Sequence, residues 1–509
     1  MSAQEKIHDV AVIGFGPSGA VAAGLLGGYG LSTYVCDRSR EVYDKPRAIA
    51  LDHEIMRVFQ QLGVVDAIAP YTEPFTDSCY YGVEGQLIRR MSTVAPPYPM
   101  GYVPSIVFTQ PPVEGILREH VRGLANVKVE LSVTLAGLTQ DAQGVTLQVK
   151  EEDGTARSIR ARYVIACDGA SSTTRELAGI SLQDLGFDEP WLVVDVRVND
   201  KGLAKLPNVS VQYCEPSRPS SFIMGPGNHR RWEISINQGE DPREVATPEG
   251  AWKLLSRWIT PDDAELWRQA SYRFHALVAD KWRAGRVFVA GDAAHQQPPF
   301  LGQGMCQGVR DVSNLAWKLA AVLKGAASEA LLDTYGPERK GHVTELTTRI
   351  KHVGQMIGER DEQQARERDA RLLEECGGEV KPIPRQNVQP ALAAGLITAQ
   401  AQVARGTLFP QPWLLRAGEA VRMDQAAGTG WRLVLKDAAL QANAVDAPVS
   451  LTVLALGSAD CTETEGVLAA WFAQQQCAAA LVRPDHYVYG VANDAAQLKD
   501  LFTQLRSQL

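Results

Sequence analysis

The sequence lacks the features that mark several classes of protein. No apolar run approaches the roughly 18 residues of a membrane-spanning helix. Eight scattered cysteines include no CxxC motif, which favours reduced thiols over a disulfide framework or a metal site. No block of Lys or Arg offsets the formal net charge of −8, which argues against nucleic-acid binding. These absences predict a soluble, cytoplasmic protein.

The composition is that of an ordinary globular protein. The chain has 509 residues, of which 45% are hydrophobic and 22% are charged. This length and composition predict two or three domains and exclude a largely disordered chain. Strand and helix patterns alternate up to about residue 123, and strand patterns dominate 127–166 and 190–237. A helical pattern covers about 304–373, and a compact α/β tail follows an Ala- and Pro-rich linker after Pro382.

Residues 8–38 read HDVAVIGFGPSGAVAAGLLGGYGLSTYVCDR. A buried strand passes through Gly14-x-Gly16-x-x-Gly19 into a helix of small residues, and a second strand ends at Asp37. Such glycines let the backbone approach a diphosphate at the helix N-terminus, and a carboxylate about 20 residues further on accepts hydrogen bonds from a ribose. The pattern predicts a dinucleotide site, with a turn that binds nothing as the alternative. Its expected residues are Gly14, Gly16, Pro17, Ser18, Gly19, Asp37 and Arg38.

Two further motifs follow in order along the chain. Residues 163–172 read YVIACDGASS, a strand followed by Asp168-Gly169-x-x-Ser172, and residues 285–295 read GRVFVAGDAAH, an apolar strand that ends in Gly291-Asp292. Each aspartate could instead serve only to organise the turn after its strand. With Gly14-x-Gly16-x-x-Gly19, the ordered set resembles the single-component FAD-dependent aromatic hydroxylases. The branch that hydroxylates 3-(3-hydroxyphenyl)propionate is most similar, through PRAIALDHE at 46–54 and GQGMCQGVRDVSNLAWKL at 302–319.

The resemblance implies an α/β fold in three parts. A Rossmann-like FAD-binding domain with a parallel sheet, formed by residues 1–180 and 281–380, would be intertwined with a mixed-sheet substrate domain at 181–280. Residues 381–509 would form a linker and a thioredoxin-like C-terminal domain. Because Cys461 and Cys477 are 16 residues apart, dithiol redox chemistry is not expected there. Packing is the expected role of this tail, with a homodimer interface as one place for it.

The resemblance also implies roles for residues around a non-covalent FAD. Asp292 would accept a hydrogen bond from a ribityl hydroxyl, and the start of the long helix, with Gly304, Met305 and Cys306, would face the flavin. Pro299 would supply a carbonyl oxygen near the reacting carbon, or merely stiffen the loop with Pro298. The remaining cofactor-binding residues expected from the motifs are Arg47, Gln110, Asp168 and Gly291. His295 is expected to be a packed loop residue rather than a base.

The resemblance implies hydroxylation of a phenolic ring, with ortho as the expected position, by NADH or NADPH and O2 through a flavin C4a-hydroperoxide. A group with a pKa near the working pH must help to deprotonate the phenol. Tyr213 falls where the family carries a phenolate-binding tyrosine, although a tyrosine on a sheet commonly only packs. A family aspartate is replaced by Ile49, which leaves Asp52 and His53 as alternatives. A substrate carboxylate would require an arginine, and the candidates are Arg218, Arg230, Arg231 and Arg273.

Other functions remain open from the sequence. The same fold could hydroxylate a polyketide-type ring or a nitro- or halo-substituted phenol. A flavin halogenase is disfavoured because the GWxWxI motif of those enzymes is absent. A non-catalytic flavoprotein scaffold is the third alternative.

Overall fold

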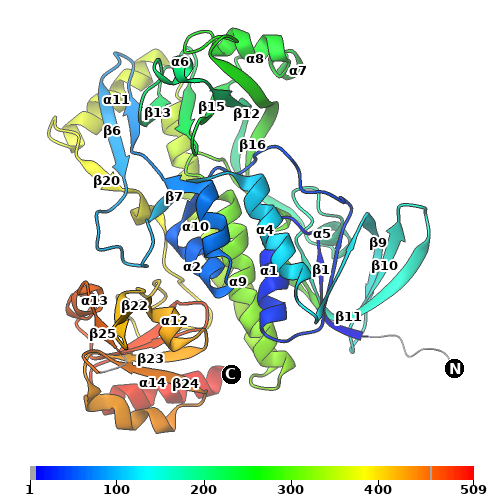
Figure 1. Ribbon diagram of the computed structural model, residues 1–509, viewed down its shortest axis with the longest axis vertical. Coiled ribbons are helices and arrows are strands. Elements are labelled where there is room, and N and C mark those ends of the chain that lie inside the picture. The colour runs from blue at the N-terminus through cyan, green and yellow to red at the C-terminus, as the bar shows by residue number, and fades with distance from the viewer. Residues whose placement is uncertain (1–6, 459–460) are drawn as a thin grey trace.

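The protein is described here by a computed structural model, which covers residues 7–458 and 461–509. Its first sheet has a central run of parallel strands (Figure 1). The strand order is β17 (Arg283–Ala284), β18 (Val287–Val289), β11 (Ala156–Ala166), β1 (Ile7–Ile13), β2 (Thr33–Asp37) and β8 (Val127–Leu131). The pairs from β18 to β8 are all parallel, so their carboxyl ends share one edge. This is the Rossmann-like arrangement that the sequence predicts.

Both faces of this first sheet are covered. Side chains alternate between the faces along a strand, so Val10 and Val12 belong to one apolar core while Ala11 and Ile13 belong to another. The helices α1 (Pro17–Gly28), α4 (Gln110–Arg122) and α9 (Gly304–Leu323) contribute to the first core. A meander of β9 (Val133–Gln140) and β10 (Val145–Glu151) extends antiparallel from β11 and covers the opposite face.

The second sheet lies at the top of Figure 1 and is mixed. Its order is β19 (His295–Gln296), β16 (Ala264–Ala279), β12 (Leu182–Val198), β15 (His229–Ser235), β14 (Ser220–Met224), β13 (Ser210–Tyr213), β5 (Ser78–Tyr81), β6 (Leu87–Ser92) and β20 (Pro382–Pro384). Strands β5, β6, β19 and β20 come from outside residues 181–280. The sheet is therefore assembled from several distant segments, and the predicted first FAD-binding part also contributes to it.

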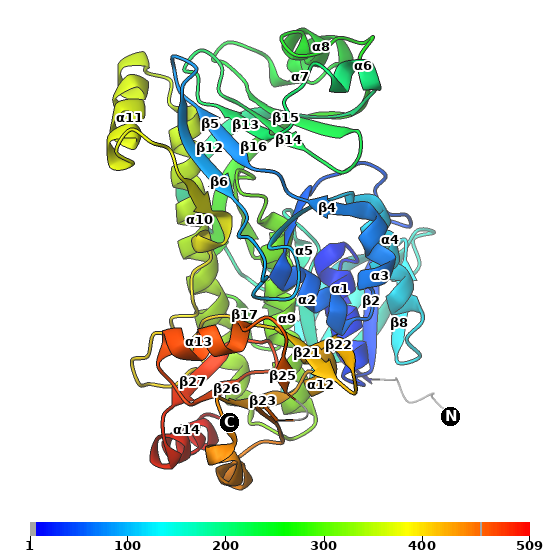
Figure 2. The same cartoon turned by 60° about the vertical axis from the view of Figure 1, so that its left-hand side comes forward.

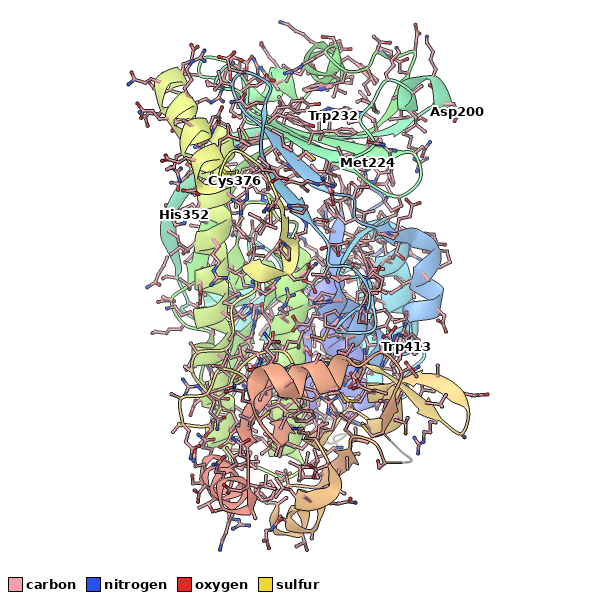
Figure 3. All side chains as sticks on the ribbon, turned by 90° about the vertical axis from the view of Figure 1, so that its left-hand side faces the viewer. Asp200, Met224, Trp232, His352, Cys376 and Trp413 are labelled. Carbon is pink, nitrogen blue, oxygen red and sulfur yellow. The ribbon has the colours of Figure 1, made fainter. Side chains whose placement is uncertain are left out.

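The two faces of the second sheet differ in chemistry. Trp232, labelled in Figure 3, and Ile234 belong to an apolar core together with helix α8 (Pro248–Leu255). We call this the outer face. Arg231 and Glu233 point the opposite way because side chains alternate along β15. Arg231 hydrogen-bonds to the carbonyl oxygens of residues 46 and 47, so this inner face is turned toward the first sheet.

Long helices connect the two sheets. The predicted helical region consists of α9, α10 (Tyr335–Gly358) and α11 (Glu362–Glu375), with η3 (Glu329–Thr334) before α10. Figure 2 shows α10 running between the level of the upper sheet and that of the C-terminal elements. Among the helices of the described residues, none combines the length and apolar character needed to cross a membrane.

The C-terminal region forms a separate four-stranded mixed sheet at the lower left of Figure 1. Its order is β24 (Leu451–Ala455), β23 (Trp431–Leu435), β26 (Ala479–Val482) and β27 (Val488–Ala492). Strands β23 and β24 are parallel, whereas β26 and β27 pair antiparallel. Helices α13 (Val467–Gln475) and α14 (Ala495–Gln508) complete it, so the α/β character expected of the tail is present.

Candidate active site

The first glycine motif forms the turn between β1 and α1. A Cβ atom on Gly14 would lie 2.3 Å from the carbonyl oxygen of Cys167, and one on Gly19 would lie 1.9 Å from that of Gly14. Those two glycines are therefore required by close packing of the chain itself. Gly16 differs: its φ of −68° suits any residue, and no protein atom lies within 4 Å of its Cβ position. The bare backbone at Gly16 leaves the N-terminus of α1 open to a ligand.

Two predicted cofactor-binding carboxylates organise turns. Asp37 accepts hydrogen bonds from the backbone N–H groups of Phe15, at 2.6 Å, and Ser39, at 2.7 Å. Asp168 accepts from the Ser172 hydroxyl and from the N–H and hydroxyl of Thr174, at 2.9 and 2.8 Å. Both carboxylate oxygens of Asp168 therefore take part in organising the turn after β11. Arg38, next to Asp37, is exposed.

The Gly291-Asp292 turn follows β18 on the shared edge of the first sheet. Asp311 of α9 accepts a hydrogen bond from the Gly291 N–H at 2.9 Å and one from His295 Nε2 at 2.7 Å. Asp292 is exposed, and no described group hydrogen-bonds to its carboxylate. The surrounding protein raises the pKa of Asp292, while His295 and Arg47 act in the opposite direction. The turn thus presents a carboxylate with free acceptor capacity, whereas His295 is packed against Trp282 as expected.

The loop before α9 leads to a second bare helix start. The carbonyl oxygen of Pro299 accepts a hydrogen bond from Gly302 N–H at 2.7 Å, so in the structure it closes a turn. No protein atom lies within 4 Å of a Cβ position on Gly304, the first residue of α9. Met305 is half-buried, and the buried Cys306 thiol contacts the carbonyl oxygen of Ala50 at 3.7 Å. Burial raises the pKa of Cys306 well above its ordinary value, so this thiol is unreactive.

The loop that carries Arg47 is held from two sides. Gln110, the first residue of α4, accepts hydrogen bonds from the N–H groups of Arg47, at 3.0 Å, and Ala48, at 2.6 Å. From the second sheet, Arg231 donates to the Arg47 carbonyl oxygen at 2.8 Å. The Arg47 side chain itself is exposed and lies near enough to Asp292 to lower the pKa of that carboxyl. Gln110 therefore positions the loop, and its amide oxygen is already in use.

The structure gives Tyr213, the residue expected to bind a phenolate, a packing position instead. Tyr213 lies on the outer face of the second sheet, where its ring packs against Trp258 and its hydroxyl accepts a hydrogen bond from Trp258 Nε1 at 3.1 Å. Arg257 covers the same ring at 4.9 Å. Because strand side chains alternate, the neighbouring Gln212 faces inward instead.

Asp52 and His53 are also unsuited to the proton transfer expected of them. Asp52 caps α2 (His53–Gln61) by accepting from the N–H groups of Glu54 and Ile55, and its other oxygen pairs with Arg310. Burial alone would raise the pKa of Asp52, but Arg310 and His53 outweigh it and lower that pKa. Burial lowers the pKa of His53 to about 4. Both groups are structural in this arrangement.

The four candidate arginines for a substrate carboxylate all have protein partners. Arg218 pairs with Glu240, Arg273 with Asp188 and Arg231 with Asp195. Arg230 donates to backbone carbonyl oxygens of residues 225, 227 and 229. Arg218, Arg231 and Arg273 are thus engaged in ion pairs, and Arg230, which shares the Trp232 side of β15, points away from the inner face.

The inner face carries a polar row that motif reasoning missed. Gln212, Ser221 and Glu233 stand on the neighbouring strands β13, β14 and β15, and pairing places them side by side. The Ser221 hydroxyl donates to Gln212 Oε1. Glu233 is 4% exposed, no described group hydrogen-bonds to its carboxylate, and burial raises its pKa to about 7, against the effect of Arg231. The alternation in RRWEIS, residues 230–235, was the signal that could have revealed Glu233.

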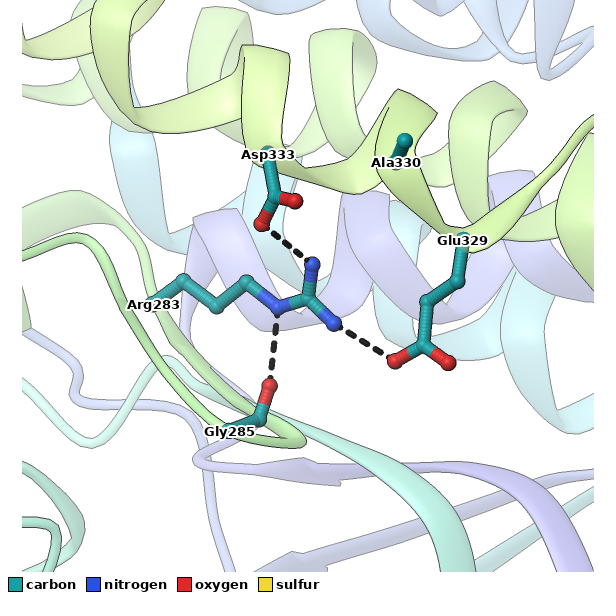
Figure 4. A pocket seen from close by; sticks show the side chains of 5 residues that line it. All are labelled: Arg283, Gly285, Glu329, Ala330 and Asp333. Carbon is teal, nitrogen blue, oxygen red and sulfur yellow. Dashed lines mark hydrogen bonds and ion pairs between the residues drawn. The ribbon is translucent and has the colours of Figure 1, made fainter.

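A separate surface pocket is lined mainly by charged side chains (Figure 4). Arg283 lies at its centre and pairs with Glu329 at 2.7 Å and Asp333 at 2.6 Å. Its Nε donates to the Gly285 carbonyl oxygen at 2.8 Å. Because Glu329 and Asp333 neutralise the Arg283 guanidinium, the pocket offers no free positive charge to a ligand.

The parallel sheet, the bare starts of α1 and α9 and the free carboxylate of Asp292 define a dinucleotide-binding protein. These groups fit FAD: Gly16 leaves backbone N–H groups open to a diphosphate, and Asp292 can accept from a ligand hydroxyl.

Comparison with known proteins agrees with this class. The family described as FAD binding domain matches residues 8–350, and the HcaD C-terminal domain matches residues 406–508. The chain is 36% identical to a probable NADH-specific resorcinol 4-hydroxylase of Rhodococcus jostii, covering 99% of this chain and 95% of that protein. It is 34% identical to a 3-(3-hydroxy-phenyl)propionate/3-hydroxycinnamic acid hydroxylase of Mycolicibacterium smegmatis, over 84% of this chain and 76% of that protein.

A solved structure shares the fold over the whole chain. The flavin-dependent monooxygenase PieE, in complex with FAD and substrate, superposes with a TM-score of 0.83 at 21% identity and covers 100% of both chains. The chain belongs to the FAD binding domain family, and it is an FAD-dependent monooxygenase. The family resemblance seen in the sequence is thereby confirmed.

Proposed function

We propose that the protein hydroxylates a phenolic ring ortho to an existing hydroxyl, using NADH and O2. The observation that carries the proposal is the buried, unpartnered carboxyl of Glu233 in the polar row of the inner face. The relatives named as resorcinol and 3-(3-hydroxy-phenyl)propionate hydroxylases support a phenol as substrate, and the first supports NADH as reductant. Bound FAD, reduced and combined with O2, would supply the oxygen atom.

Glu233 suits the proton transfer that this reaction needs. A phenol becomes a strong nucleophile at the ring carbon only as its hydroxyl loses a proton, and a base works best with a pKa near the operating pH. Burial raises the pKa of Glu233 to about 7, so the carboxyl can accept that proton near neutrality. Ser221 and Gln212 beside it are placed to hydrogen-bond to a second polar group on the ring.

The experiment compares Glu233→Gln with Tyr213→Phe in the FAD-loaded enzyme. With resorcinol or 3-(3-hydroxyphenyl)propionate, we expect Glu233→Gln to lower the rate of ring hydroxylation about 10²–10⁴-fold, because the base is lost. Tyr213→Phe, on the outer face, should keep the parent rate. In the parent the rate should fall as pH drops through about 7, where Glu233 becomes protonated, and this dependence should vanish in Glu233→Gln. Product mass, NADH oxidation and peroxide are measured together.

Failure of the proposal would be plain in these measurements. If no phenol stimulates NADH oxidation, the proposed reaction is wrong. If phenols are hydroxylated but Glu233→Gln keeps the parent rate and pH profile, the reaction stands and Glu233 is not its base.

We further propose that the C-terminal sheet is a thioredoxin-like domain without dithiol chemistry. The parallel pair β23–β24 beside the antiparallel strands β26 and β27, with α13 and α14, supports this assignment. The division into FAD-binding parts at 1–180 and 281–380, a substrate sheet at 181–280 and a tail at 381–509 is proposed with it. Strands β5, β6 and β20 cross those boundaries to join the substrate sheet.

A further inference from the structure

A turn of the C-terminal region reaches the helix that begins at the candidate active site. Residues 483–487 join β26 to β27, and we call them the 483–487 turn. His486 in this turn has φ +71°, a left-handed conformation that costs free energy for a residue other than glycine. Its neighbours Arg483, Asp485 and Tyr487 are all buried. A buried turn that keeps a strained backbone is held in place by its contacts.

The first contact joins Tyr487 to the start of α9. The Tyr487 hydroxyl donates to Glu54 Oε1 at 2.8 Å, and Glu54 Oε2 pairs with Arg310 Nε at 2.5 Å. Arg310 also donates to the side chain of Gln303, the residue that precedes α9, at 3.0 Å. This chain of buried polar groups therefore runs from the C-terminal region through α2 to the N-terminus of α9.

The second contact lies further along α9. Arg310, Asn314 and Lys318 are spaced by four residues, so they share one side of the helix. Asn314 donates to Asp485 at 3.0 Å and to Glu338 at 2.6 Å, while Lys318 pairs with Glu338 at 2.8 Å.

Arg483, in the 483–487 turn, completes this cluster of buried charged groups. It pairs with Glu338 at 2.6 Å and with Asp485 at 2.6 Å. A buried charge that loses its partner costs free energy, so these ion pairs fix the position of α9 relative to the 483–487 turn.

The other sides of α9 touch the cofactor motifs. Asp311 holds the Gly291 N–H, as described above, and a Cβ on Gly308 would lie 2.2 Å from Ser18 Oγ of the first glycine motif. Tight packing on three sides means that a small shift of α9 moves both motifs.

We propose that the 483–487 turn is a positioning element of the FAD site, which fixes α9 and so sets FAD affinity and the reduction potential of the flavin. Tyr487 is its principal positioning residue, since its hydroxyl is the link to the start of α9. A helix N-terminus carries partial positive charge and favours the more negative, reduced flavin. The inference rests on FAD binding by this family and not on the identity of the aromatic substrate.

The chain offers a matched pair of variants for the test. Tyr487→Phe removes only the hydroxyl that reaches Glu54. Tyr489→Phe, two residues along in β27, removes a hydroxyl that donates to Gln508 Oε1 at 2.8 Å within the C-terminal region. Both variants lose one hydrogen bond of a buried tyrosine, but only the first loses a bond to the FAD-binding part.

The measurements are the Kd for FAD of the apoprotein, from flavin fluorescence, and the midpoint potential and Tm of the holoenzyme. We expect Tyr487→Phe to weaken FAD binding about three- to tenfold, as for one lost hydrogen bond, and to lower the midpoint potential. Tyr489→Phe should keep both values while its Tm falls to a similar degree.

Equal FAD affinity and potential in the two variants would overturn the proposal. Should Tyr487→Phe not fold, Glu54→Asp shortens the same link from the other side and is compared with Tyr489→Phe in the same way. No measurement requires a substrate, so failure of the proposed hydroxylation would leave this test unaffected.

Discussion

At the residue scale, Asp292 stands apart from the other acidic residues of the predicted site. The carboxylate oxygens of Asp37, Asp52 and Asp168 are engaged in turns, a helix cap and an ion pair with Arg310, whereas no described group hydrogen-bonds to Asp292. A carboxylate that the protein leaves free at the edge of a parallel sheet is placed to accept from a ligand. The difference separates carboxylates that are engaged within the protein from one that is free to bind a ligand.

Replacement of Asp292 by Ala should therefore weaken FAD binding without harm to the fold. The lost charge-assisted hydrogen bond corresponds to roughly a ten- to hundredfold higher Kd. Titration of the apoprotein with FAD gives the constant, and Asp168→Ala is the comparison, because loss of its turn bonds should instead lower Tm. An unchanged Kd in Asp292→Ala would mean that the Gly-Asp pair serves only the turn.

At the element scale, the glycines of α1 divide into those that serve packing and those that serve the ligand. Gly19 allows the helix to approach the turn after β1, since a Cβ there would lie 1.9 Å from the Gly14 carbonyl oxygen, whereas no protein atom lies within 4 Å of the Cβ position of Gly16. Gly28, at the other end of α1, is equally open but exposed and distant in sequence from the motif. The two open glycines make a matched pair for mutation.

Gly16→Ala should keep the protein folded and yet weaken FAD binding by more than about tenfold, because its methyl group occupies the space through which the diphosphate approaches. Gly28→Ala should leave the FAD Kd unchanged and raise stability by up to about 1 kcal/mol, as alanine favours the helix. Thermal unfolding and FAD titration of both proteins decide the matter. Equal Kd values for the two variants would show that Gly16 does not face the cofactor.

At the scale of the whole molecule, buried ion pairs join the C-terminal region to the FAD-binding part. Asp424 of α12 (Met423–Ala427) pairs with Arg57 of α2 and Arg432 of β23. Burial alone would raise the pKa of Asp424, but Arg57, His486 and Arg432 outweigh it and hold that pKa well below its ordinary value. Arg483 and Lys318 likewise lower the pKa of Glu338, against the effect of burial. Both carboxylates must stay ionised for the parts to remain joined.

These lowered pKa values predict acid sensitivity. A carboxylate whose folded pKa lies below its unfolded value, about 4, adds stability at neutral pH and loses it progressively below about pH 5. Asp424→Asn should cost about 3–5 kcal/mol at pH 7, because Arg57 and Arg432 lose their partner, and should flatten the decline of Tm with acid. Asp141→Asn, at an exposed pair with Arg160, is the control. Parallel decline of Tm in the parent and Asp424→Asn would contradict this account.

Local patterns in the sequence determined the main elements of the fold and the motifs that predict the cofactor site. Gly14, Gly16, Gly19 and Asp292 are recognisable because a tight turn or a strand end depends on residues that are neighbours in the chain. The long helices and the α/β tail follow from periodicity for the same reason, whereas the parallel sheet was implied by the family resemblance. FAD as cofactor followed from three such motifs in order, and the family match confirms it.

Only the tertiary structure decided which side chains lie next to one another and which are buried. Tyr213 and Gln212 are adjacent in the chain but lie on opposite faces of a sheet. An error of one residue in the strand pattern therefore assigns a packing residue to the candidate site. Glu233 has a pKa near 7 because distant segments bury it, and Tyr487 reaches Glu54 across 433 positions of sequence. Burial and long-range contact arise from the packing of the whole chain, and no local spacing encodes them.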